Sequence, residues 1–160
     1  MTKNINLIAL PGIPLARPGD DLIDFIFLGL ENANEQLADG DILVIAQKIV
    51  SKSENRYVEL KTISPSKEAL NLATQTDKDP RLVQLILSES REVIRHRPGV
   101  IIVEHKLGFV MANAGIDNSN VENSQKGERV LLLPINPDET CNNICQGIKE
   151  KSNKHFSSLF

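Results

Sequence analysis

The chain has 160 residues, of which 41% are hydrophobic, and this is enough to bury one ordinary core. Its 18 Lys and Arg residues against 21 Asp and Glu residues give a formal net charge of -3, and the 4% of aromatic residues include no Trp, so nothing favours a nucleic-acid partner. No apolar run reaches the roughly 20 residues of a membrane-spanning helix, and residues 1–6 lack a signal-peptide pattern. We therefore expect a cytoplasmic protein that binds neither nucleic acid nor membranes.

The N-terminal third of the sequence predicts a helix with a strand on either side. Residues 5–10 form a short strand-like run, which Pro11 and Pro14 bring to an end. Apolar residues recur at helical spacing over residues 20–37, which predicts one amphipathic helix. Residues 42–46 are an uninterrupted apolar run, and we expect a strand buried on both faces at the centre of a sheet.

The middle of the chain predicts two short helices and a hairpin. A helix is expected to begin at Ser64-Pro65 and another at Asp79-Pro80, because a good N-cap residue precedes a proline at the first helical position. The pattern of the second helix allows it to continue through residues 92–96. Short apolar runs at residues 100–103 and 109–111 flank a natural turn, so we expect them to pair as a hairpin.

The C-terminal part predicts a strand at residues 130–134 and a last helix. That helix is expected to begin at Asn136, because Asn136 and Glu139 have the spacing of a capping box. The elements together predict an α+β fold in which a mixed sheet has flanking helices, as a single domain over residues 1–160.

Cysteine and histidine spacing gives no sign of a zinc site. Cys141 and Cys145 lie four residues apart in a predicted helix without the partner pair that zinc requires. His96, His105 and His155 are scattered, and we expect them at the surface or at strand edges.

Two loops in the N-terminal third are candidate phosphate sites. Residues 12–16 are rigid and would suit a wall for a nucleotide base or phosphate, although alone they are more typical of a plain turn. Gln47 and Lys48 with Ser51 and Lys52 place two cations and two small donors at the end of a predicted strand, where a triphosphate could bind. The alternative for this segment is a solvated basic turn.

A third loop, residues 112–120, is the most suggestive. Its small residues allow close approach of a ligand, Asp117 offers a hard oxygen ligand for magnesium or manganese, and Asn113 and Asn120 could orient a nucleotide. A plain turn is an equal alternative, since Asn and Asp are common turn residues. The sequence has neither a P-loop nor a dinucleotide fingerprint and no nucleophile elbow, so any nucleotide site is of an unusual kind and no catalytic residue is assigned.

Several segments, taken in order, resemble the coenzyme F-420:L-glutamate ligase family, a group of gamma-glutamyl ligases. The resemblance runs from about Leu10 to residues 137–138. It is carried by residues 12–14, 18–22, 40–52, 78–83, 89–90, 112–120 and 131–134.

The resemblance implies a GTP- and metal-dependent ligase. Its members phosphorylate a carboxylate of the F-420 precursor with GTP, and the amine of L-glutamate then displaces phosphate, with two Mg²⁺ or Mn²⁺ ions on the transferring group. It also implies a homodimer. The positions that match GTP contacts are Ile13, Pro14, Leu15, Ala16, Gln47, Lys48, Lys52 and Asn120, and Asp117 matches a metal ligand.

One departure from the family concerns its second half, which carries an Asp-Thr pair and a Gln that complete the two-metal site. Nothing in these 160 residues matches that half, so we expect no ligase activity unless a complementary second half is supplied. Two alternatives stay open at this point: a noncatalytic nucleotide-binding module and a dimerising structural fragment.

Overall fold

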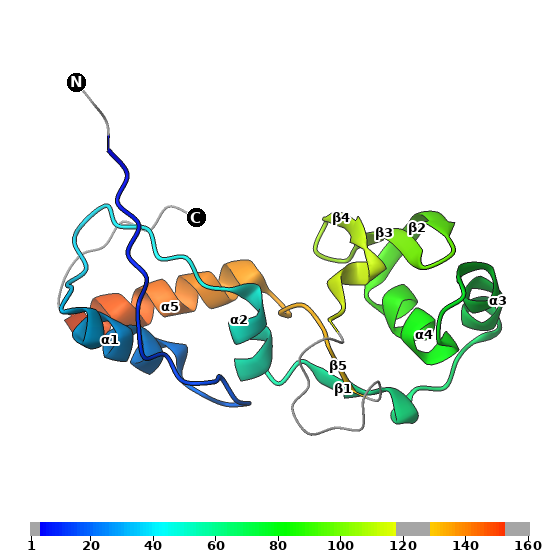
Figure 1. Ribbon diagram of the computed structural model, residues 1–160, viewed down its shortest axis with the longest axis horizontal. Helices are drawn as coiled ribbons and strands as arrows, with labels where there is room; N and C mark the ends of the chain where they lie inside the picture. The colour runs from blue at the N-terminus through cyan, green and yellow to red at the C-terminus, as the bar shows by residue number, and fades with distance from the viewer. Residues whose placement is uncertain (1–3, 118–128, 153–160) are drawn as a thin grey trace. The chain divides into compact units, whose positions relative to one another are not determined.

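The computed structural model describes residues 4–117 and 129–152 (Figure 1). The chain divides into two compact units, which we call the terminal unit, residues 1–55 with 136–160, and the central unit, residues 56–135. The described residues form helices and two small antiparallel sheets, so the predicted α+β class is confirmed. The mixed sheet is not seen in these ranges, because every described strand pair is antiparallel. That the chain is a single domain stays a prediction.

The terminal unit contains α1 (Leu22–Ala33), α2 (Gln47–Ser53) and α5 (Pro137–Ser152). The predicted first helix is confirmed: the Asp21 carboxylate accepts the Ile23 N–H at 2.8 Å, and Asn34 ends the helix in the left-handed conformation. The core of this unit is formed by buried apolar residues of the three helices, namely Leu22, Ile26, Leu30, Val50, Ile144 and Ile148.

The start of α5 confirms the predicted cap. The Asn136 side-chain oxygen accepts the Glu139 N–H at 3.3 Å, and the Asn136 amide donates to the Glu139 carboxylate at 3.0 Å. Further along, Gly147 contacts Ile23 of α1 so closely that a Cβ has no room there. The helices α1 and α5 therefore pack with a small residue between them.

The two strands predicted in the N-terminal third are wrong. Residues 4–10 and 41–46 are neither helix nor strand, and the structure pairs neither range with any described strand. Leu43 and Ile45 pack against the core of the terminal unit, whereas Ile42 and Val44 are 67% and 85% exposed. The apolar run at residues 42–46 suits a strand that is buried on both faces. In the structure, the described residues cover only one side of this segment. The run itself carries no information about which other segments lie beside it.

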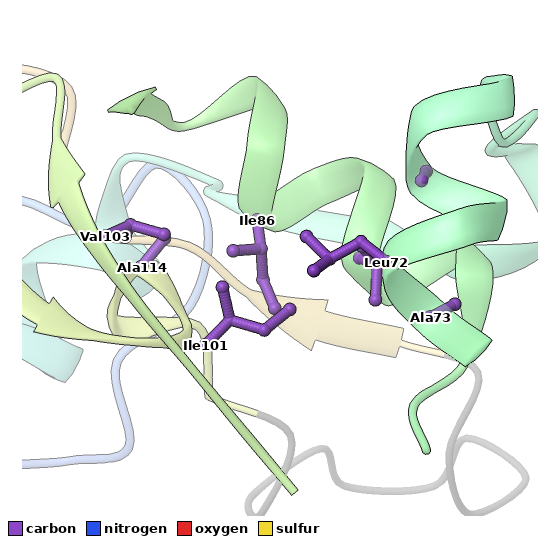
Figure 2. Packing of buried hydrophobic residues seen from close by; sticks show 8 residues of the cluster. Leu72, Ala73, Ile86, Ile101, Val103 and Ala114 are labelled. Carbon is purple, nitrogen blue, oxygen red and sulfur yellow. The ribbon is translucent and has the colours of Figure 1, made fainter. Parts of the chain in front are cut away.

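The central unit packs α3 (Lys67–Thr76) and α4 (Pro80–Ser88) on one face of the sheet formed by β2 (Ser90–Arg97), β3 (Val100–His105) and β4 (Val110–Ala112). Ile86 of α4 and Ile101 and Val103 of β3 are fully buried between them (Figure 2). A second sheet pairs β1 (Tyr57–Glu59) with β5 (Arg129–Leu131). Short 3-10 helices follow β1 at Leu60–Thr62 and β4 at Asn113–Gly115.

The start of α4 and the β3–β4 hairpin are confirmed, but two other predictions in this unit need correction. Asp79 caps α4 by accepting the Arg81 N–H at 2.8 Å, with Pro80 at the first position. By contrast, α3 begins after Ser66 and not at Ser64-Pro65, because the Ser66 hydroxyl accepts the Ala69 N–H. Residues 92–96 are strand and not helix, because α4 ends at Ser88 and β3 supplies an antiparallel partner. The predicted strand at 130–134 is shorter and ends at Leu131.

None of the helices in the described ranges is both long enough and apolar enough to cross a membrane.

Candidate functional site

The loop at residues 12–16 is held against α1 in the terminal unit. The Asn32 amide donates to the Pro11 carbonyl at 3.2 Å, and Gly12, at φ 74°, leaves no room for a side chain beside Asn32. Ile13 packs on Gly29, where an added Cβ would lie 2.8 Å from the Ile13 Cδ1 atom. The chain segment that should contact GTP is therefore anchored from one side.

The remaining residues of this loop differ in exposure. Pro14 and Leu15 are exposed, and the Leu15 side chain keeps 66% of its surface, whereas Ala16 is buried at 9%. Just beyond the loop, the Gly19 N–H donates to the carbonyl of Ser53 at 2.9 Å. This bond ties the loop to the C-terminal end of α2, so both segments predicted to bind GTP belong to one packed unit.

The predicted site at Gln47, Lys48 and Lys52 forms a helix instead of a loop after a strand. Lys48 and Lys52 lie four residues apart in α2 and share one face. The opposite side of the helix is fixed by Val50 and by Ser51, which is fully buried and accepts a 2.6 Å hydrogen bond from the Gln47 amide. The helix thus presents two half-buried lysines on a rigid support.

Asp117 belongs to the central unit, where its backbone is fixed from two sides. Its N–H donates to the Leu131 carbonyl at 2.9 Å, and its carbonyl accepts the Leu131 N–H at 2.8 Å. Just before it, Gly115 lies under Leu133, and a Cβ there would approach that side chain to 3.1 Å. The Asp117 carboxylate is half-buried and is carried by a braced segment.

Asn113, also singled out in this loop, has a structural contact. Its side-chain oxygen accepts the Ile101 N–H at 3.1 Å, and its φ of 52° lies in the left-handed region that Asn tolerates. Asn120 lies outside the described residues.

A metal centre requires several ligands close together. Within residues 4–117 and 129–152, no three His, Cys, Asp or Glu side chains gather in a way that could hold an ion. Asp117 supplies a single carboxylate, so the two-metal site that the resemblance implies is not formed by these ranges alone.

The sequence predictions missed a buried polar cluster, Arg56, Glu89 and His105. His105 was expected at the surface or at a strand edge, but at the end of β3 it is only 3% exposed. The signal was present, because Ile101, Val103 and His105 alternate along the strand and point to the same buried face. Arg56 donates to Glu89 at 2.9 Å, which makes this a partly buried ion pair beside the histidine.

Comparison with known families identifies the class of protein. The family model described as F420-0:Gamma-glutamyl ligase matches residues 12–158. The chain therefore belongs to the F420-0:gamma-glutamyl ligase family.

Individual relatives carry the name coenzyme F420:L-glutamate ligase. The protein of Methanothermobacter thermautotrophicus is 43% identical over 155 residues, which is 97% of this chain and 60% of the relative. That of Methanosarcina mazei is 40% identical over 154 residues, or 95% of this chain and 56% of the relative. That of Methanocaldococcus jannaschii is 43% identical over 127 residues, or 79% and 49%. The chain thus spans about half to three fifths of the length of these relatives.

Proposed function

We propose that this chain supplies the nucleotide-binding part of a GTP- and divalent-metal-dependent ligase that adds L-glutamate to the coenzyme F420 precursor. The observation that carries the proposal is the family match over residues 12–158, with the names of the relatives. Because the matched region is 60% of the Methanothermobacter relative, we propose the complete activity for this chain together with a complementary second half.

The proposed reaction joins a carboxylate to an amine, and a carboxylate alone is a poor acyl donor. A carboxylate oxygen of the precursor attacks the γ-phosphorus of GTP, which forms an acyl phosphate and releases GDP. The amine of L-glutamate then attacks the acyl carbon. Phosphate leaves with the electron pair of the broken C–O bond, the amine loses a proton, and a γ-glutamyl amide bond remains.

Residues of the terminal unit would bind GTP. The lysines on the shared face of α2 support this role, because an ammonium group is a compact cation suited to phosphate oxygens. They would also stabilise the negative charge that grows on the β-phosphate as GDP leaves. The proposed contacts are Ile13, Pro14, Leu15, Ala16, Gln47, Lys48 and Lys52, with Asn120 as a further nucleotide contact.

Asp117 would be one carboxylate ligand of Mg²⁺ or Mn²⁺. Since the described ranges gather no three ligand-type side chains, we derive no reaction step through the metal. The other ligands would come from the complementary half, as the family resemblance implies.

The exposed side of residues 41–46 supports the proposal of a partner. Ile42 and Val44 alternate with side chains that pack on the core, which is the pattern of a strand with one covered face. Their backbone has no strand partner among the described residues, so we propose that a strand of the partner pairs with it. We commit to the complementary half as the occupant, because the relatives contain a region that this chain does not match.

The test is a calorimetric titration of GTP into the 160-residue chain, with and without Mn²⁺, before and after addition of the unmatched region of the Methanothermobacter relative as a separate chain. Lys52→Ala should weaken GTP binding about tenfold with or without metal, since it removes one phosphate contact. Lys61→Ala, at an exposed position of the central unit, is the matched control and should bind GTP like the parent. Equal affinity of the Lys52 variant and the parent would contradict the role of α2.

A further inference from the structure

His105 has a buried polar atom that has no hydrogen-bond partner among the described residues. Its Nδ1 atom accepts the Leu107 N–H at 3.0 Å, so in the neutral ring the proton sits on Nε2. That Nε2 atom is buried and makes no hydrogen bond within residues 4–117 and 129–152. It lies 3.9 Å from the Glu89 Oε2 atom, which is beyond hydrogen-bond distance.

The same Glu89 oxygen is already held by Arg56. The Arg56 Nη2 atom donates to Glu89 Oε2 at 2.9 Å, while its Nε atom donates to the Leu133 carbonyl at 2.7 Å. The Arg56 carbonyl in turn accepts the Leu132 N–H at 3.0 Å. Arg56 therefore connects the carboxylate of Glu89 to residues 131–133, the segment that pairs with Asp117.

The burial of His105 favours its neutral form. Burial lowers the pKa of His105 from its ordinary 6.5, and the cations of Arg56 and Lys106 lower it further, against the opposing effect of Glu89. The nearby Arg91 guanidinium is paired with Glu104 at 2.7 Å, which neutralises its charge locally.

We propose that Arg56, Glu89 and His105 form a pH-sensitive latch, which holds residues 131–133 and the paired Asp117 while His105 is neutral and releases them when His105 is protonated. A protonated His105 would place a second cation beside one carboxylate that already binds Arg56. The new proton adds at Nδ1, which therefore loses the Leu107 N–H bond. The positive ring then repels the Arg56 guanidinium and competes with it for Glu89, and this loosens the hold of Arg56 on Leu133. The inference concerns the central unit alone and goes beyond the proposed ligase function.

The direction of the pH dependence follows from the sign of the shift. The pKa of His105 is lower in the closed latch than the ordinary 6.5 of an exposed histidine. The opened state therefore binds more protons below that value, and the latch loses stability as the pH falls. Its full contribution is present above pH 6.5 and disappears as the pH falls through the lowered pKa.

The test is NMR on the full 160-residue chain between pH 8 and pH 5. Amide exchange at Asp117, Leu131 and Leu132, after division by the intrinsic rate, should accelerate by up to about tenfold per pH unit between the two pKa values. The imidazole shifts of His105 should follow the same curve, and at neutral pH its ring should carry the proton on Nε2. A pH-independent exchange at these amides would overturn the proposal.

A pair of variants separates His105 from other titrating groups. His105→Asn keeps an acceptor for the Leu107 N–H but cannot be protonated, so exchange at Asp117 should become independent of pH. His96→Gln removes an exposed histidine of β2 and should leave the pH dependence of the parent. If the His105 variant folds and keeps the full pH dependence, the latch is excluded. If the variant does not fold, the parent chain provides the test: the titration of the His105 imidazole and the amide exchange of Leu132 should follow the same pH curve, and different curves would exclude the latch.

Discussion

Each unit has a backbone segment without a strand partner on one side among the described residues, and the two segments differ in character. In the central unit, β2 lies at the end of its described sheet, and its register is interrupted by irregularities between Ser90 and Glu92 and between Val93 and Arg95. Its exposed residues are mostly charged, as in edges that resist pairing with other chains. In the terminal unit, residues 41–46 carry Ile42 and Val44 on the uncovered side. One edge is built to remain unpaired, and the other is suited to be covered.

The cores of the two units differ in how deeply their apolar residues are buried. Val83, Ile86, Ile101 and Val103 of the central unit are all 0% exposed. Each buried residue of the terminal core, in contrast, keeps 4% to 9% of its surface accessible, and none of them reaches 0%. The central unit therefore completes its core from its own elements, while the terminal unit leaves apolar surface for a neighbour.

The largest effect is expected from a truncation in the completed core. Ile86→Ala removes buried methylene and methyl groups from the contact between α4 and β3 (Figure 2) and should destabilise the protein by about 3–4 kcal/mol. Leu70→Ala, at a 48% exposed position of α3, is the control and should change stability by less than about 0.5 kcal/mol. Urea unfolding measures both, and similar effects for the two variants would contradict the picture of a closed central core.

A smaller effect tests which serine begins α3. Ser66→Ala removes the hydroxyl that accepts the Ala69 N–H at 3.1 Å and should cost about 1 kcal/mol. Ser64→Ala should cost almost nothing, since the described cap does not use that residue. Helical circular dichroism during thermal unfolding measures both variants, and a larger loss for the Ser64 variant would restore the helix start that the sequence suggested.

Local signals predicted the elements whose cause is local. Asp79 and Asn136 were identified as helix starts because a cap depends on residues a few positions apart. The local pattern allowed the second helix to continue through residues 92–96, because it could not reveal that β2 pairs with β3, a partner later in the chain. At 42–46, the apolar run indicated burial but could not show that a neighbour would be missing.

The candidate site shows the same division. Residue types alone selected Asp117, Lys48 and Lys52, since hard carboxylates and ammonium groups are the ligands that metals and phosphates require. The bracing of Asp117 by Leu131 was not predictable, because it joins segments separated by residues of no clear pattern. His105 was open to prediction from the alternation in β3, but its approach to Glu89 depends on the packing of α4.

The smallest effect on stability, and the sharpest test of the comparison, comes from a charge on the uncovered edge. Val44→Lys places a cation at an 85% exposed position and should change the stability of the chain by less than about 0.5 kcal/mol. It should nevertheless abolish association with the unmatched region of the Methanothermobacter relative in sedimentation experiments, because the lysine charge would have to be buried when that region covers this surface.

Ile94→Lys makes the matched change at a 50% exposed position of the already protected β2 edge, and association should be retained. If both variants associate normally, the surface at residues 41–46 is not the docking edge. If the parent chain instead pairs with itself and Val44→Lys makes it monomeric, the occupant is a second copy of this chain and not the complementary half. The comparison of the two edges would then hold, and the proposed partner would be wrong.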